Sequence, residues 1–257
     1  MDFGKYSAPA LEKGLDILEL LANEPSGMSK TEIANKLDRT INEIFRMLVV
    51  LEGRGFIWSS NQTDKYTLTL KMFELSHKNP PIKKLTSASS DIIKELSADL
   101  KQSCHIAVYY SGKGHVVAQQ DAPTDVVFSV RLGVEVKLFG SCSGHILFAF
   151  STETEREQML KDIPKGHPRP SRSEIEELVQ RVTAQGYESM ASLRTANAFD
   201  FGFPIFDHTG SVAASIVVPF LPRIGEDMAA DEDTIIDQLR IASSKISSSL
   251  GFEQTES

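Results

Sequence analysis

Apolar residues recur at helical spacing near the start of the chain. Over residues 11–22 they fall every three or four positions, which predicts an amphipathic helix. The helix is expected to end before Pro25, because proline disfavours the helical conformation in the residue that precedes it. Its predicted apolar face comprises Leu11, Leu15, Leu18 and Ala22.

Two capping boxes follow this helix. Ser29 with Glu32, and Thr40 with Glu43, have the spacing at which a hydroxyl and a carboxylate satisfy the free N–H groups of a helix start. They predict a short helix that begins at Ser29 and a longer one that begins at Thr40 and ends near Gly53. The predicted buried stripe of the longer helix comprises Ile41, Ile44, Phe45, Leu48 and Leu51.

A predicted β-hairpin comes directly after the second of these helices. Residues 56–58 and 66–68 are typical of strands, and the polar residues 59–65 between them are typical of a turn. Two helices joined by about three residues form a helix-turn-helix, and a hairpin placed after them is a wing. The pattern therefore predicts a winged helix-turn-helix DNA-binding domain over residues 1–76.

The second helix of such a unit enters the major groove of DNA, where its first side chains contact base edges. Asn42 and Arg46 lie one turn apart, opposite the buried stripe; asparagine suits adenine, and arginine suits guanine or a phosphate. Cations and helix-start N–H groups suit phosphates, whereas Glu43 is explained by its capping role. The side-chain chemistry thus selects Ser29, Lys30, Arg39, Asn42, Arg46 and Lys65 as DNA contacts.

Strand and helix patterns alternate in the rest of the chain. Residues 77–84 contain a Pro-Pro pair and predict a joint, and a helical period follows to about residue 102. Beyond it, strands in hairpins with helices between them predict an α+β fold. We therefore expect a linker and connecting helix at 77–102 and a second domain at 103–257.

The elements expected in this second domain follow from local patterns. A capping box of Ser173 and Glu176 predicts one helix that ends at Gly186. Hairpins are predicted at 106–118 and 199–218, a further strand at 126–130, and helices at 143–150, 153–161 and 234–250.

A sheet flanked by helices commonly holds a small-molecule pocket. Alternation over residues 199–203 places the three phenylalanines of this run on one face and Asp200 on the other. Core packing accounts for most of the aromatic residues, and Phe128 is kept as a pocket candidate. The aromatic residues that gather in this domain are Phe128, Phe139, Phe199, Phe201 and Phe203.

Residues 140–144 (GSCSG) fit the pattern of a cysteine nucleophile elbow between a strand and a helix. The alternative function is therefore a thiol-dependent hydrolase that uses Cys142, with a histidine as base. Antiparallel hairpins disfavour it, because that enzyme fold needs a parallel sheet. The six histidines show no metal-binding spacing, so we expect no metal, no cofactor and no catalytic residue.

Composition narrows the class of protein. The chain has 257 residues, of which 41% are hydrophobic and 24% are charged, and neither a secretory signal nor a membrane-length apolar run is visible. Two distant cysteines, Cys104 and Cys142, exclude a disulfide framework. A cytoplasmic protein that does not enter the membrane is the simplest interpretation.

Net charge first argues against a nucleic-acid binder, because it is −8. Residues 1–80, however, hold 10 basic and 11 acidic side chains, whereas residues 81–257 hold 17 and 24. The acidic excess therefore lies mainly outside the predicted DNA-binding domain, and DNA binding is not excluded. Operator affinity is expected to rest on local contacts.

Taken in order, several segments make the chain resemble the IclR family of bacterial transcriptional regulators. The segment LEKGLDILELL is similar to the first helix of the family, and MSKTEIANKL with TINEIFRMLVVLEGRGFI is similar to its helix-turn-helix. RLGVEVKLFGSCSGHILFAF is similar to its pocket loop, and AFDFGFPIFDHTGSVAASIVV to its signature hairpin. The resemblance covers residues from about 10 to 250.

This resemblance implies an operator-binding winged helix, a GAF-like effector-binding domain and a homodimer or dimer of dimers. Three positions depart from the family pattern: a usual glycine is Asp38, a usual histidine is Phe139 and a usual cysteine is Asp200. The family's DNA-reading positions fall on Asn42, Glu43, Phe45 and Arg46. Its effector-binding positions fall on Phe139, Gly140, Ser141, Cys142, Ser143, Asp200 and Ser215.

We therefore expect a transcriptional regulator rather than an enzyme. A small organic effector, such as an aromatic or carboxylate metabolite, is expected to control its affinity for double-stranded operator DNA. Phe139 would make the pocket more apolar and suit an aromatic ring. A module whose winged helix binds protein instead of DNA is a further alternative.

Overall fold

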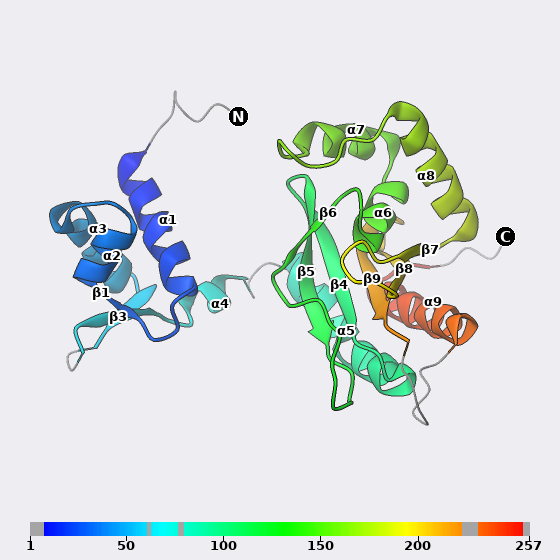
Figure 1. Cartoon of the computed structure of the whole chain (residues 1–257), viewed down its shortest axis with the longest axis horizontal. Helices are drawn as coiled ribbons and strands as arrows, with labels where there is room; N and C mark the ends of the chain where they lie inside the picture. Colours follow the sequence, from blue (N-terminus) through cyan, green and yellow to red (C-terminus); the bar gives the residue numbers. More distant parts are fainter. Residues whose placement is uncertain (1–7, 61–62, 77–79, 223–230, 254–257) are drawn as a thin grey trace. The chain divides into compact units, whose positions relative to one another are not determined.

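The computed structural model describes residues 8–60, 63–76, 80–222 and 231–253 (Figure 1). It divides into two compact units, Met1–Pro80 and Pro81–Ser257, and each has its own hydrophobic core. Residues 61–62 of the predicted wing turn and residues 77–79 of the predicted joint lie outside the described residues.

The first unit is a winged helix-turn-helix, as predicted. Its described strands form a three-stranded antiparallel sheet in the order β1-β3-β2. The two-residue β1, which pairs with β3, has no signal in the sequence. The elements are α1 (Pro9–Ala22), β1 (Met28–Ser29), α2 (Lys30–Lys36), α3 (Ile41–Gly53), β2 (Ile57–Ser59), β3 (Lys65–Leu68) and α4 (Lys71–Ser76).

Two predicted faces in this unit are wrong. Helix α1 buries the face that carries Gly14, Ile17 and Leu21, and leaves Leu11 and Leu15 62% and 48% exposed. In α3 the core side chains are Ile44 and Leu48, with Leu51 half-buried, because only this face meets α1 and α2. The supposed stripe residues Ile41 and Phe45 are 41% and 50% exposed.

The second unit is built on one antiparallel sheet, which confirms the predicted α+β class. Its described strands run in the order β6-β5-β4-β9-β8-β7. Helix α5, which the sequence assigns to the linker 77–102, packs in the core of this unit. The elements are α5 (Pro80–Leu100), β4 (Cys104–Tyr110), β5 (Lys113–Gln120), β6 (Glu135–Lys137), α6 (Cys142–Ala149), α7 (Glu153–Asp162), α8 (Arg172–Gln185), β7 (Glu188–Ala191), β8 (Phe199–Phe206), β9 (Val212–Phe220) and α9 (Glu232–Ser249).

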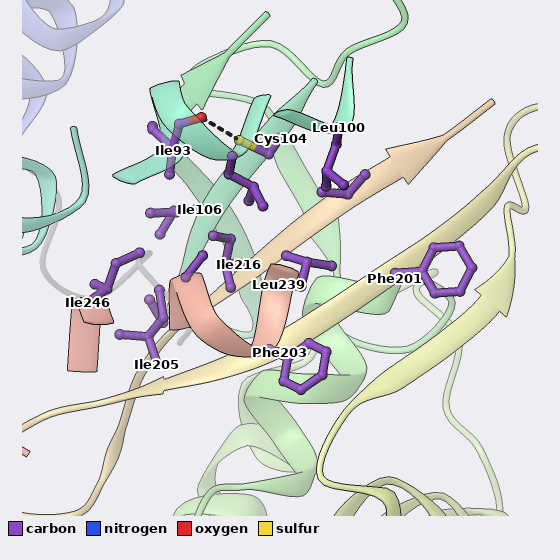
Figure 2. Packing of buried hydrophobic residues seen from close by; sticks show 14 of the residues in the cluster. Ile93, Leu100, Cys104, Ile106, Phe201, Phe203, Ile205, Ile216, Leu239 and Ile246 are labelled. Carbon is purple, nitrogen blue, oxygen red and sulfur yellow. Dashed lines mark hydrogen bonds between the residues drawn. The ribbon is translucent and has the colours of Figure 1, made fainter. Parts of the chain in front are cut away.

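Helices cover both faces of this sheet. On one face, α5 and α9 pack on alternate residues of β4, β8 and β9; Figure 2 shows Ile106, Phe203 and Leu239 within this cluster. Cys104 lies here too, where its thiol donates to the Ile93 carbonyl oxygen at 3.4 Å. The opposite face of the sheet meets α6, whose side chains are almost all buried, so residues 200, 202, 215 and 217 turn toward that helix.

Two expectations for this unit are wrong, and one strand was missed. Residues 126–130 form no strand; the third partner of the β4–β5 hairpin is instead β6, which pairs with β5. Strand β7, which extends the sheet beyond β8, is not predicted. The box that starts α8 is Ser171 with Glu174, two residues before the predicted pair, although the helix does end at Gly186.

Candidate functional site

The turn between α2 and α3 fixes the helix-turn-helix geometry of the first unit. Asp38 adopts a left-handed conformation with φ of 50°. The N–H groups of Asp38 and Arg39 donate to the carbonyl oxygens of Asn35 and Ala34 at 3.3 and 2.9 Å, which is a Schellman motif. Glycine adopts the left-handed conformation most easily, and aspartate tolerates it better than most other residues do. This tolerance explains why Asp38 can occupy the position.

The start of α3 carries the predicted DNA-reading side chains. Thr40 and Glu43 form the predicted capping box, and the Glu43 carboxylate also accepts from Lys13 Nζ at 2.9 Å. The Thr40 N–H and Lys13 lower the pKa of Glu43 to about 2. Glu43 is therefore ionised and already paired within the unit, whereas Asn42 and Arg46 are exposed and have no side-chain partner among the described residues.

The remaining predicted DNA contacts lie on α2, its flanks and the wing. Ser29 caps α2 with Glu32, and its backbone pairs with Lys65 across β1 and β3. Lys30 is exposed at the start of α2, and Arg39 lies 3.9 Å from Asp16 in an exposed ion pair. Lys30 follows Ser29 along the chain, and Lys65 is its partner across the sheet. The structure thus places these two cations next to Ser29.

The second unit contains a cavity of ≈ 280 Å³ beside the start of α6. Strands β4, β8 and β9 supply its floor, and the irregular segments 128–131 and 192–195 supply its walls. Larger hollows of ≈ 600 and ≈ 670 Å³ run along α8. The smaller cavity is lined by His105, Phe128, Ser129, Val130, Arg131, Val134, Val136, Ser141, Cys142, Ser143, Ser192, Arg194, Thr195, Asp200, Val217 and Pro219.

A histidine that sequence analysis missed distinguishes this cavity. His105 is 3% exposed, and its Nε2 lies 3.1 Å from Ser143 Oγ. Its Nδ1 is, among the described residues, the one buried side-chain nitrogen or oxygen without a hydrogen-bond partner. Burial, and secondarily Arg194, lowers the pKa of His105 to about 4, so the ring is neutral at pH 7. A buried polar group of this kind is usually satisfied by a ligand or by water.

The buried neutral state of His105 predicts a pH dependence of stability. The unfolded chain protonates this histidine below about pH 6.5, but the folded chain does so only near pH 4. Its stabilising contribution is therefore present above pH 6.5 and is lost as the pH falls to 4, at a cost of at most about 3 kcal/mol. Urea unfolding of the His105→Gln variant should show a smaller loss of stability over this range than the wild type. If the unfolding free energies of the two proteins changed with pH in parallel, the prediction would be contradicted.

Cys142 lacks the surroundings of a nucleophile. The thiol is 1% exposed and donates to the Glu188 carbonyl oxygen at 3.7 Å. Burial, with Asp200 and Glu188 nearby, raises the pKa of Cys142 well above its ordinary value, whereas a catalytic cysteine needs a lowered one. No histidine bonds Cys142 among the described residues, so the hydrolase alternative finds no support in the geometry.

A buried ion-pair network holds the loop beside the cavity. Glu188 is completely buried; it accepts two bonds from Arg181, at 2.6 and 2.8 Å, and one from His145 Nδ1 at 2.7 Å. The other nitrogen of His145 accepts from the Gly140 N–H at 3.3 Å. Burial opposes ionisation of Glu188, but Arg181 and His145 prevail and lower its pKa. The network therefore ties β7 and α8 to the loop that leads into α6.

Asp200 and Arg194 face the same cavity without touching each other. No hydrogen bond or ion pair joins either side chain to another residue in the described part of the chain. Burial raises the pKa of Asp200 to about 6, an effect that Arg194 opposes. The charge of Arg194 therefore acts on Asp200 without a direct contact, and both side chains remain available to a ligand.

The structure brings together most, but not all, of the predicted effector contacts. Phe128, Ser141, Cys142, Ser143 and Asp200 line the cavity. Phe139 does not: its ring packs edge-on against Phe148, with centroids 4.9 Å apart, and it borders the ≈ 600 Å³ hollow along α8 instead. Gly140 and Ser215 also lie outside the lining; Gly140 bonds His145, and the buried Ser215 hydroxyl donates to the Ala107 carbonyl at 3.4 Å.

Two family models match this architecture in the same order. Residues 10–58 match the IclR helix-turn-helix domain, and residues 82–248 match the C-terminal domain of the bacterial transcriptional regulator IclR. The chain belongs to the IclR family. It is accordingly a transcriptional regulator with a DNA-binding helix-turn-helix domain and an effector-binding C-terminal domain.

Curated relatives span nearly the whole chain. The transcriptional regulator KdgR of Escherichia coli is 23% identical over 251 residues, which are 96% of this chain and 94% of the relative. BhcR of Paracoccus denitrificans is 26% identical over 241 residues, or 90% and 85% of the two chains. These identities extend the family likeness across both units of the IclR-family chain.

Solved structures share the IclR fold. The Thermotoga maritima IclR structure is 22% identical, with a TM-score of 0.73, and the match covers 94% of this chain and 98% of that one. An IclR homologue from Microbacterium hydrocarbonoxydans, solved with 4-hydroxybenzoate, is 17% identical with a TM-score of 0.76 over 94% and 98% of the chains.

Two further observations concern only the residues that the structure describes. Within 8–60, 63–76, 80–222 and 231–253, no helix is both long and apolar enough to cross a membrane. The same part of the chain holds no group of three or more His, Cys, Asp or Glu side chains placed to bind a metal ion.

Proposed function

We propose that this IclR-family regulator binds a pseudo-palindromic operator in the cytoplasm as a homodimer or dimer of dimers, and that a small organic effector in the ≈ 280 Å³ cavity controls its operator affinity. The observation that carries the proposal is the exposed start of α3. There, the polar groups of Asn42 and Arg46 have no side-chain partner among the described residues. The turn that precedes them is closed by the Schellman motif of α2 and the capping box of α3.

In this proposal Asn42, Phe45 and Arg46 contact bases or the groove, and Lys30, Arg39 and Lys65 contact phosphates. The 50% exposure of Phe45 supports the assignment, because the ring is free of the core and suits a thymine methyl group. Glu43 acts differently: its carboxylate caps α3 and pairs with Lys13. Glu43 therefore orients α3 through contacts inside the first unit.

Exposed apolar side chains of the first unit support a dimer. Leu11 and Leu15 on α1 are 62% and 48% exposed, and Leu70 and Met72 around the start of α4 are 75% and 46% exposed. Large apolar side chains at this density on a small domain commonly mark a contact with another protein surface. A symmetric dimer would present two α3 helices to two half-sites of the operator.

Footprinting tests the DNA-binding part of this proposal without any effector. The full chain is incubated with DNA from upstream of its own and neighbouring genes. Protection of two inverted half-sites separated by one or more helical turns, each about 10 base pairs, is expected. Affinity should fall steeply with added salt, because phosphate contacts release counterions. Absence of protection on every fragment would refute the proposal and favour a winged helix that binds protein.

A further inference from the structure

The polar groups of the cavity define the chemistry of its occupant more narrowly than the family does. Asp200 on β8 and Arg194 in the segment after β7 carry opposite charges and line the same ≈ 280 Å³ space. They form no ion pair within 4 Å, and neither side chain has a hydrogen-bond partner in the described part of the chain. Asp200 is half-buried, and a charge in that position normally finds a partner, so it points to a cationic group in the ligand. Arg194 is exposed at the same cavity, where it can contact an anionic group of the ligand.

The first turn of α6 adds a second group for an anion. The Ser141 hydroxyl accepts from the Gly144 N–H at 3.1 Å and so caps the helix. The backbone N–H groups of Cys142 and Ser143 have no acceptor among the described residues, and both residues line the cavity. Free N–H groups at a helix start attract anions. Together with Arg194, they supply groups that suit an anion in the same space that Asp200 lines.

The orphaned nitrogen of His105 is an independent sign that the cavity is built for an occupant. This side chain is only 3% exposed, and its Nδ1 has no partner among the described residues, although the ring lines the cavity. The rest of the lining is mixed: apolar surface comes from Phe128, the valines and Pro219, and polar groups come from Ser129, Arg131, Ser192 and Thr195. A fitting ligand therefore carries two opposite charges close together and an apolar body.

We propose that the cavity binds a small zwitterion, an α-amino acid with an apolar side chain, whose ammonium contacts Asp200 and whose carboxylate lies between Arg194 and the first turn of α6. The inference rests on the proposed function, because it names the effector class for the same cavity.

The charged surroundings of Asp200 set the expected pH dependence. The groups that line the same cavity are Arg194, Arg131, the neutral His105 and the un-ionised Cys142 thiol. An ammonium requires the ionised carboxylate, and the pKa of Asp200 is raised to about 6 by burial. Between pH 5 and 7 the competent fraction, and with it the affinity, should rise roughly tenfold. A carboxylate ligand that shared a proton with Asp200 would bind more weakly over the same range.

Matched probes test the inference. L-valine, L-leucine and L-phenylalanine are titrated into the full chain by calorimetry and thermal shift, each beside the carboxylic acid that lacks the amino group and the amine that lacks the carboxylate. At least one amino acid should bind at pH 7 and raise Tm, whereas its two partial analogues bind at least roughly tenfold more weakly. Tighter binding of every des-amino acid, or binding of none of the amino acids, would overturn the inference.

Two variants assign the contacts. Asp200→Asn should weaken binding of the amino acid at least tenfold and remove its pH dependence, and Arg194→Gln should weaken binding of both the amino acid and its des-amino analogue. Asp99→Asn, an exposed aspartate on α5, is the matched control and should change nothing. Unchanged affinity in Asp200→Asn would overturn the inference. The footprint without effector remains a separate readout, so loss of the amino-acid inference leaves the DNA-binding proposal intact.

Discussion

Replacing Arg46 with alanine is expected to weaken operator binding by more than an order of magnitude. The guanidinium is exposed on α3, one turn after Asn42, and has no partner within the described residues. One base contact of this kind contributes about 1–3 kcal/mol. Because a dimer carries two copies, the loss should reach at least roughly thirtyfold in Kd, measured by fluorescence anisotropy on the footprinted fragment.

The control for this variant lies on the same helix. Arg54 is also exposed, but it stands at the C-terminal end of α3, which does not enter the groove in this family of motifs. Arg54→Ala should keep wild-type affinity, and both variants should keep the wild-type unfolding curve. Equal affinities of the Arg46→Ala and wild-type proteins would mean that α3 does not read the operator.

A Glu188→Ala variant is expected to lose about 1–3 kcal/mol of unfolding free energy, because a buried hydrogen-bonding group is left without its partner. The His145 ring, 14% exposed, loses its acceptor and with it the orientation that holds Gly140, whereas the Arg181 side chain is 47% exposed and can turn to water. Urea unfolding followed by circular dichroism measures the change. The folded pKa of Glu188 lies below its ordinary value, so the wild-type advantage is present above about pH 4.5 and is lost as the pH falls through the folded pKa.

An exposed pair provides the comparison. Arg172 and Glu176 lie 2.8 Å apart on α8, with side chains 93% and 65% exposed, and such pairs contribute less than about 1 kcal/mol. Glu176→Ala should therefore leave the unfolding midpoint almost unchanged. Equal effects of the two glutamate variants would show that the Glu188 network stabilises no more than a surface contact does.

The amino-acid pattern predicts elements better than it predicts faces and partners. Residues 11–22 contain two overlapping apolar stripes. Periodicity alone does not say which stripe meets a neighbouring helix, and the predicted stripe, which is richer in leucine, is the more exposed one. The Ser-x-x-Glu pattern likewise occurs twice before α8, at Ser171 and at Ser173, and the first is used. Residues 126–130 have strand composition but no strand to pair with, so they form a cavity wall instead.

The cavity of the second unit also depends on residues whose partners the sequence pattern does not predict. His105 meets Ser143 across 38 positions of sequence, and Arg194 meets the cavity from a segment without any pattern. Of these residues, only His105 could have been predicted from the sequence. A histidine inside the otherwise apolar strand 104–110 needs a polar partner when it is buried. Phe139 was misplaced because a loop residue next to a pocket has two directions open to it, and this one turns to Phe148.

The burial of both thiols has a practical consequence for spectroscopy. Cys104 and Cys142 are each 1% exposed, and burial raises the pKa of Cys104 to about 12. Since maleimides and methanethiosulfonates react with exposed thiolates, the native chain should behave as a cysteine-free background. Cysteines introduced at exposed positions such as Lys36 in the first unit and Glu176 in the second would then take dyes or spin labels selectively. Energy transfer between such labels would follow, in real time, how an effector changes the separation of the two units.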